Sequence, residues 1–222
     1  MSTLLSGWLL APSVSTYGPG IDHLYNIVLV LTAIVFVLTE AALVLFCFRY
    51  RARPGQAVEP SHGSTKAEII WTTIPALIMI TLGFMSQNLW AKLRPQAAAM
   101  PAADVTVQVS AEQWLWNFRV ATPTGEIDTQ NEVHIPVNQR VRFELSAKDV
   151  IHGFYIPDLR INQDTVPGIT SSIWVQATRT GQFEIRCTQF CGTNHYQMKG
   201  RLTVDSPEDY QAWLNNAKAE AF

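Results

Sequence analysis

The sequence predicts a transmembrane hairpin of two helices, followed by an all-β sandwich of Greek-key type and a short C-terminal helix. Three observations lead to this fold class. The first 95 residues of the 222-residue chain contain two long apolar runs. From residue 101 onward, short runs rich in Val, Ile, Phe and Tyr alternate with turn residues. The final segment, 206–222, opens with the residues that begin helices.

The two apolar runs have the length and composition of membrane spans. Residues 26–48 carry one charge, Glu40, and residues 69–90 carry none. Each run is close to the ~20 residues that cross a ~30 Å hydrocarbon core. Pro75 favours a membrane span, where helix breakers are tolerated, over a buried soluble helix. The alternative, two core helices of a large soluble fold, leaves too little chain to bury them. Glu40 is a functional or subunit-pairing candidate at this depth, whereas Cys47 is expected to be an inert packed thiol.

The loop between the runs predicts the orientation of the hairpin. Residues 49–66 contain four basic residues and one acidic residue, a net charge of +3. Short loops rich in Lys and Arg stay in the cytoplasm, so both chain ends are expected outside. We therefore expect an outward-facing lead-in at 1–25, the hairpin at 26–95 and an outer domain at 96–222. The first twenty residues lack a basic n-region and a clear cleavage site, so no standard signal peptide is predicted.

The outer domain shows the spacing of a β-sandwich. Between six and eight short strands separated by turns are typical of a Greek-key sandwich, and about 120 residues suffice for one such core. The predicted strands are DVTVQVS at 104–110, VHIPV at 133–137, RVRFELSA at 140–147, VIHGFYIP at 150–157, SSIWVQA at 171–177, QFEIRC at 182–187 and GRLTV at 200–204.

The C-terminal segment carries the signals of a helix start. Ser206 is the predicted cap, and Pro207 occupies the first helical position. Two acidic residues follow, which favours the positive end of the helix dipole. The apolar face that is expected to dock on the sandwich consists of Tyr210, Trp213 and Leu214.

The charge of the outer domain is mildly negative. Residues 101–222 hold 14 acidic and 10 basic residues, a net charge of −4. This balance argues against a nucleic-acid partner. It suits a basic protein partner on the outer face, and it equally suits an ordinary solvated surface.

Soft metal ligands are concentrated in one short segment, CTQFCGTNHYQM, from Cys187 to Met198. It contains Cys187, Cys191, His195 and Met198, and His152 lies on an earlier predicted strand. Each residue has an ordinary alternative role. The cysteines could form a disulfide in an outward-facing domain, His152 could be a packed core histidine, and Met198 could fill the core. A metal site explains all five residues together.

The donor types indicate which metal such a site would take. Thiolates and a thioether select soft ions, and imidazole suits copper or zinc. Methionine is a poor zinc ligand, and a blue-copper centre needs only one cysteine. Two thiolates can instead bridge two copper ions, each with one imidazole, and Met198 and a backbone carbonyl complete the set. Bound metal would hold the thiols as thiolates. Such a site offers no evident position for a substrate and suits electron transfer.

These residues resemble those of a known family, subunit II of the heme–copper oxidases of the cytochrome c oxidase type. The pattern C-x3-C-x3-H-x2-M with an upstream His is that family's dinuclear copper motif, known as CuA. The segments AEIIWTTIPA, EQWLWNF, DVIHGFYIP and INQDTVPG extend the resemblance over nearly the whole chain. It implies a cupredoxin-like outer domain and an integral protein of a bacterial plasma membrane, with that domain on the periplasmic face.

The resemblance also implies roles for single residues. The copper ligands would be His152, Cys187, Cys191, His195 and Met198, with the main-chain carbonyl of Gln189. Trp114 matches the aromatic residue that receives electrons from cytochrome c, and its alternative is a buried sandwich tryptophan, a role that Trp116 also suits. Glu68 matches an acid at the inner mouth of a proton channel, and its alternative is a helix-start acid. Asp149 and Asp164 match outer-domain acids, Asp149 near the cytochrome c docking area.

Two positions depart from the family pattern. Gln189 stands where Glu is usual, and Asn162 stands where Lys is common. A backbone carbonyl does not depend on its side chain, so the copper ligation is unaffected. The family's Glu also reaches a magnesium ion at the subunit interface. A neutral amide is a weaker partner for a hard cation, so the magnesium site is left open.

The function implied is an electron-entry subunit of a membrane terminal oxidase. Its partners would be cytochrome c or a related outer-face donor, a heme-bearing catalytic subunit I with other oxidase subunits, and membrane lipid. The chain has no C-x-x-C-H motif, so heme is expected only in the partner subunit. Three alternatives are the corresponding subunit of a copper-containing nitric oxide reductase, a quinol oxidase subunit II, which lacks the copper ligands, and a non-enzymatic membrane-anchored copper carrier.

Overall fold

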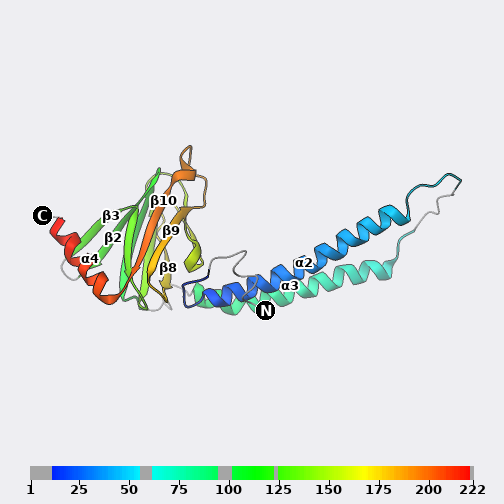
Figure 1. Cartoon of the computed structure of the whole chain (residues 1–222), viewed down its shortest axis with the longest axis horizontal. Coiled ribbons are helices and arrows are strands. Elements are labelled where there is room, and N and C mark those ends of the chain that lie inside the picture. Colours follow the sequence, from blue (N-terminus) through cyan, green and yellow to red (C-terminus); the bar gives the residue numbers. More distant parts are fainter. Residues whose placement is uncertain (1–11, 56–61, 95–101, 123–124, 221–222) are drawn as a thin grey trace. The chain divides into compact units, whose positions relative to one another are not determined.

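The computed structural model describes residues 12–55, 62–94, 102–122 and 125–220 (Figure 1). The chain divides into two compact units. One is Gly20–Ala91, and the other combines Met1–Pro19 with Lys92–Phe222. Parts of the expected lead-in (1–11) and of the basic loop (56–61) lie outside the described residues, as do the last residue of the expected hairpin and the start of the expected outer domain (95–101).

The first unit is a hairpin of two long helices, α2 (Gly18–Arg49) and α3 (Thr65–Leu93). Both are long and apolar enough to cross a membrane, and their most apolar stretches have no buried residues. The helices extend beyond the predicted runs 26–48 and 69–90, because helical turns continue through the mixed polar and apolar residues at 18–25, 65–68 and 91–93. Pro75 lies inside α3, which continues past it.

The second unit is a sandwich of two five-stranded sheets. One has the strand order β3-β2-β1-β5-β8 and the other the order β4-β10-β9-β6-β7. Two short helical turns, η2 (Pro157–Leu159) and η3 (His195–Gln197), lie in loops. The strands of the first sheet are β1 (Val105–Glu112), β2 (Leu115–Thr122), β3 (Gly125–Gln130), β5 (Arg140–Ala147) and β8 (Ser171–Gln176). Those of the second are β4 (Glu132–Pro136), β6 (His152–Ile156), β7 (Ile161–Thr165), β9 (Gly181–Cys187) and β10 (Lys199–Asp205).

An aromatic cluster joins the two sheets. Residues of β5 are buried at every second position, as expected for a strand with one face on a core. Phe154 of β6 lies between rings of the opposite sheet, with centroid distances of 5.3 Å to Trp116, 6.4 Å to Phe118 and 5.4 Å to Phe143. All four side chains are almost completely buried. The apolar alternation of the sequence therefore produces the predicted sandwich core.

The predicted fold class is confirmed, but the expected number of strands was too low. All seven predicted strands are present, and the described residues contain three more, β2, β3 and β7. β3 and β7 are edge strands built from mostly polar residues, GEIDTQ and INQDT, so they lack an apolar signal. In β2, Trp116, Phe118 and Val120 alternate into the core. The apolar Leu115 and Ala121 on either side of them partly hide this alternation in the sequence.

Residues before α2 also contribute to the sandwich. Val14 is completely buried, and its backbone N–H donates to the carbonyl of Asp158 at 2.8 Å. Its carbonyl accepts a hydrogen bond from the N–H of Thr178, also at 2.8 Å. The segment therefore bridges η2 and the residues just after β8, a contact that no local pattern in the sequence predicts.

The C-terminal helix α4 (Pro207–Glu220) docks as predicted. The Ser206 hydroxyl caps it by accepting a hydrogen bond from the N–H of Asp209 at 3.1 Å. Tyr210 and Leu214 are buried against Ile127 of β3. Trp213 stacks on the ring of His134, with centroids 4.7 Å apart and an interplanar angle of 13°. These contacts close one end of the sandwich.

The aromatic cluster gives a stability prediction. Replacing Phe154 by Ala removes a buried ring and leaves a cavity, which is expected to lower the free energy of unfolding by about 3–5 kcal/mol. The measurement is guanidinium unfolding of the detergent-solubilised chain, followed by near-UV circular dichroism. Phe190→Ala is the matched control, because that ring is 79% exposed, and its change is expected to be small. Equal effects of the two substitutions would contradict the assignment of Phe154 to the core.

Candidate metal centre

Strand pairing brings the soft ligands to one end of the second sheet. His152 is the first residue of β6, and Cys187 is the last residue of β9. These strands are antiparallel neighbours, with Phe154 opposite Cys187. The loop from Cys187 to Met198 connects β9 to β10 and is closed at its base by a hydrogen bond of 3.2 Å from the Cys187 N–H to the Met198 carbonyl.

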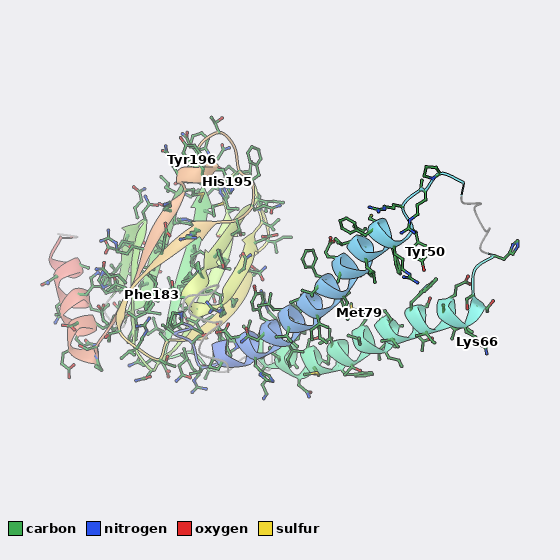
Figure 2. All side chains as sticks on the ribbon, turned by 45° about the vertical axis from the view of Figure 1, so that its right-hand side comes forward. Tyr50, Lys66, Met79, Phe183, His195 and Tyr196 are labelled. Carbon is green, nitrogen blue, oxygen red and sulfur yellow. The ribbon has the colours of Figure 1, made fainter. Side chains whose placement is uncertain are left out.

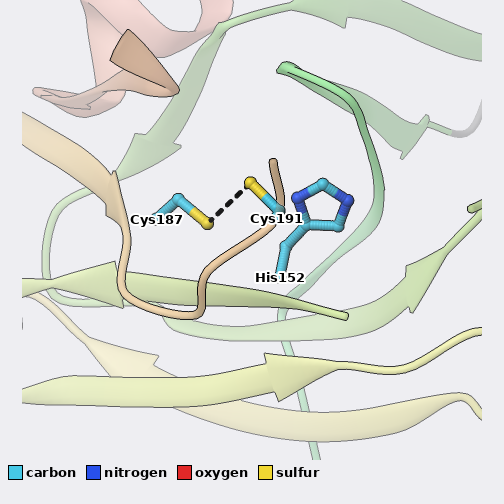
Figure 3. A group of neighbouring side chains, drawn as sticks. All are labelled: His152, Cys187 and Cys191. Atoms are coloured by element: carbon cyan, nitrogen blue, oxygen red, sulfur yellow. Dashed lines mark hydrogen bonds between the residues drawn. The ribbon is translucent and has the colours of Figure 1, made fainter. Parts of the chain in front are cut away.

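The ligand atoms converge in the space that this loop encloses. The two Sγ atoms of Cys187 and Cys191 are 3.8 Å apart, and both cysteines are free (Figure 3). The Cys191 Sγ lies 3.5 Å from Nδ1 of His195 and 3.8 Å from Sδ of Met198. Nδ1 of His152 is 3.1 Å from the same Sδ atom. A disulfide has an S–S bond of about 2.0 Å, so the cysteines are unbonded here.

A backbone oxygen joins the cluster. The carbonyl oxygen of Gln189 lies 3.2 Å from the Cys187 Sγ. The side chains of His152, Cys191 and Met198 are buried, whereas Cys187 and His195 are half-buried. The structure therefore brings together all six groups that the sequence identified.

Asp149 determines which nitrogen of His152 is available. Nε2 of His152 lies 2.9 Å from Oδ1 of Asp149. An ionised carboxylate can only accept, so Nε2 carries the proton and Nδ1 presents a lone pair towards the sulfur atoms. Asp149 also accepts hydrogen bonds from the N–H groups of Gln113 at 2.8 Å and Val150 at 2.6 Å. Partial burial acts to raise the pKa of Asp149, but these hydrogen bonds together hold it below its usual range.

The donor set fits a soft metal. Burial, and after it the neighbouring Cys187, raise the pKa of the Cys191 thiol to about 12 in the metal-free protein. A bound ion would have to replace this proton, as metals do at cysteine sites. The ligand atoms of His152, Cys187 and Cys191 lie within 4.8 Å of one another, close enough to share an ion. Two thiols, a thioether and two imidazoles favour copper over magnesium or calcium, which prefer oxygen.

A close backbone approach holds the start of the ligand loop. A Cβ atom at Gly153 would lie 2.2 Å from Oγ1 of Thr188 and 2.9 Å from the backbone N of Gln189, so only glycine fits. The Thr188 hydroxyl donates to the side-chain oxygen of Asn162 at 2.9 Å. Asn162, one of the two departures from the family pattern, thus anchors the loop to β7. The sequence alone did not indicate this role for Gly153 or Asn162.

A second contact joins the loop to the turn between β1 and β2. The side-chain amide of Gln113 donates to the backbone carbonyl of Cys191 at 2.7 Å. A Cβ atom at Gly192, which has a φ of +120°, would lie 3.3 Å from Cζ2 of Trp114. Trp114 therefore packs directly on the ligand loop. Trp116 is completely buried and meets the His152 ring edge-on at 6.2 Å, which confirms its expected packing role.

Two predicted residues lie apart from the ligand cluster. Glu68 belongs to the hairpin unit and occupies the first turn of α3, where an acid favours the positive end of the helix dipole. Asp164 lies in β7, opposite Gly153 in the strand register.

A membrane hairpin that carries a β-sandwich with a soft, cysteine-containing ligand set defines the class: a membrane-anchored protein whose cupredoxin-like outer domain has a candidate metal site. Residues 120–204 match the family described as "Cytochrome C oxidase subunit II, periplasmic domain", and residues 4–89 match its transmembrane domain. The chain belongs to the cytochrome c oxidase subunit II family, and it is a membrane protein.

Individual relatives agree over most of the chain. Cytochrome c oxidase subunit 2 of Thermostichus vulcanus is 30% identical, over 99% of this chain and 83% of the relative. The alternative cytochrome c oxidase subunit 2 of Bradyrhizobium diazoefficiens is 27% identical, over 98% and 87% respectively. Among solved structures, the periplasmic domain of subunit II of cytochrome oxidase (CoxB) of Bradyrhizobium japonicum superposes with a TM-score of 0.52. It has 27% identity and covers 54% of this chain and 97% of that one.

The hydrogen bond between His152 and Asp149 leads to a prediction about metal affinity. Asp149→Asn replaces the acceptor by an amide that can present its NH₂ group to Nε2, which weakens the control of the histidine tautomer. Outer partners of metal ligands typically contribute 10- to 100-fold in affinity, so copper affinity is expected to fall by about that factor. Chelator competition measures it. Asp128→Asn, which removes an exposed carboxylate bonded to Arg119, is the matched control; an equal loss there would refute a specific role for Asp149.

Proposed function

We propose that this chain is the electron-entry subunit of a terminal oxidase, which takes electrons from cytochrome c or a related donor on the outer face of the membrane. A partner subunit would carry the heme, reduce oxygen to water and translocate protons. The observation that carries the proposal is the convergence of two free cysteines, two histidines and a methionine on one loop-enclosed site. Membership of the subunit II family supports the oxidase context.

The residues that would hold a dinuclear copper centre are already close together. They are His152, Cys187, Cys191, His195, Met198 and the carbonyl of Gln189. The short distance between His152 and Met198 supports their binding one ion, and His195 with the Gln189 carbonyl would bind the other. When bound, such a centre accepts and releases single electrons. The protein's contribution is to hold these ligands on paired strands with their outer partners fixed, so that little rearranges.

Trp114 is proposed as the point of electron entry. Its ring packs on Gly192, the residue after ligand Cys191, and the adjacent Gln113 donates to the carbonyl of Cys191. A donor in contact with this indole would thus be one packed residue away from a ligand. Asp149, which is partly exposed and bound to His152, is proposed to contribute to docking as well as to ligand orientation.

The remaining assignments concern the membrane. We place the protein in a bacterial plasma membrane, as its family membership suggests. The N-terminus and the sandwich are placed on the periplasmic face because the loop at the opposite end of the hairpin is basic. The division at 1–25, 26–95 and 96–222 is proposed from the two apolar runs and the change in composition that follows them. Glu68 would then lie at the inner membrane surface, as a proton-channel mouth requires. Gln189 offers an amide rather than a carboxylate, so it supports copper through its carbonyl and leaves magnesium unassigned.

Copper content and paramagnetic resonance test the proposal together. The full chain, purified in detergent and loaded with copper, is expected to bind two ions per chain and to show an unpaired electron split by both nuclei. Cys187→Ser should abolish this spectrum because it removes one of the two thiolates. Cys47→Ser, which changes an exposed cysteine of α2, should leave the spectrum unchanged. A single copper with single-nucleus splitting would point instead to a copper carrier.

Electron entry is tested separately by Trp114→Phe. This substitution is expected to slow electron transfer from reduced cytochrome c by at least about tenfold, a barrier increase of ~1.4 kcal/mol, while the copper spectrum stays the same. Stopped-flow absorbance of the assembled oxidase measures the rate. Trp213→Phe on α4 is the matched control and should leave the rate unaffected. If the two variants transfer electrons at equal rates, the assignment of Trp114 is wrong.

A further inference from the structure

One ionisable residue lies deep inside a membrane helix. Glu40 is nine residues before Arg49, the basic residue that ends α2. At 1.5 Å per residue this places it about 13 Å along the helix from the charged end, near the middle of a ~30 Å hydrocarbon core. A carboxyl group at that depth is unfavourable unless another group satisfies it.

The helix itself offers no partner to this carboxyl group. The residues one turn away on the same face are apolar: Phe36, Val37, Leu43 and Val44. The adjacent hydroxyl, on Thr39, already donates to the carbonyl of Val35 at 2.8 Å. Over the described parts of the chain, no hydrogen bond or ion pair involves Glu40.

The second helix leaves this region uncovered as well. From Thr32 to Phe48, every side chain of α2 except Ala42 is exposed. The partly buried residues of α2 lie mainly before this stretch, between Ile21 and Leu31, where α2 and α3 run close together; the helices separate towards the loop (Figures 1 and 2). The half of α2 around Glu40 is therefore free to contact another protein within the membrane.

We propose that the Glu40 face of α2 is an interface with a transmembrane helix of the partner subunit, and that this helix offers a hydrogen-bond donor to the Glu40 carboxyl group. An apolar face could equally be covered by lipid, but lipid tails have no donor, and a carboxyl group selects a polar protein partner at this depth. The interface rests on the proposed role as an oxidase subunit only in requiring a membrane partner, and it is independent of the copper site.

Substitution of Glu40 tests the interface in the assembled complex. Glu40→Leu raises the hydropathy of α2, so the variant is expected to insert and fold, yet to retain at least about tenfold less partner subunit per chain after detergent washing. Glu40→Gln keeps a carbonyl acceptor of the same size and should restore retention. Thr39→Val is the matched control, since it changes the next residue at the same depth, and it should retain the partner fully.

The outcomes separate this interface from the proposed function. Copper content of each variant is measured in parallel and should be unchanged, since Glu40 and the ligands lie in different units. Full retention of the partner by the leucine variant would overturn the interface, whatever the copper result. A glutamine variant that loses the partner as the leucine variant does would overturn the hydrogen bond. A normal interface with no copper bound would instead leave the interface standing and refute the electron-entry role.

Discussion

The pairing of β6 with β9 is the constraint on which the site depends. It places His152 and Cys187 at the same end of one sheet, and the hydrogen bond between Cys187 and Met198 closes the loop that supplies the remaining ligands. The aromatic cluster around Phe154 holds β6 against the opposite sheet. Because these contacts involve backbone pairing and a close-packed core, the ligand positions are determined by the whole sandwich rather than by the loop alone.

Polar contacts around the ligands fix the tautomer of His152 and the position of the ligand loop. Asp149 fixes the protonated nitrogen of His152, Gln113 holds the carbonyl of Cys191, and the absence of a Cβ at Gly153 lets the loop approach β6. Each contact restricts the conformation of a ligand or of a residue next to one. A site held in this way changes little in geometry when its charge changes, which suits the electron-transfer role proposed above.

The two units of the chain differ in where their apolar side chains lie. The sandwich buries its apolar residues internally and presents a mixed, mildly acidic surface. The hairpin exposes nearly all of its apolar side chains, so its stability depends on lipid and on neighbouring membrane helices. Lipid tails and apolar helices can cover these apolar side chains. The carboxyl group of Glu40 also needs a polar partner, which lipid tails do not supply.

The sequence by itself determined the features that depend on local composition. Long apolar runs predict membrane helices, alternation predicts most strands, and the spacing of Cys187, Cys191, His195 and Met198 predicts a soft metal site. Strands β3 and β7 escaped prediction because edge strands need few apolar residues. Only the tertiary structure decided that Asp149 lies behind His152, that Asn162 anchors Thr188 and that Trp114 packs on Gly192. The last two contacts join residues far apart in the chain, and all three follow from the packing of strands and loops, so no local pattern records them.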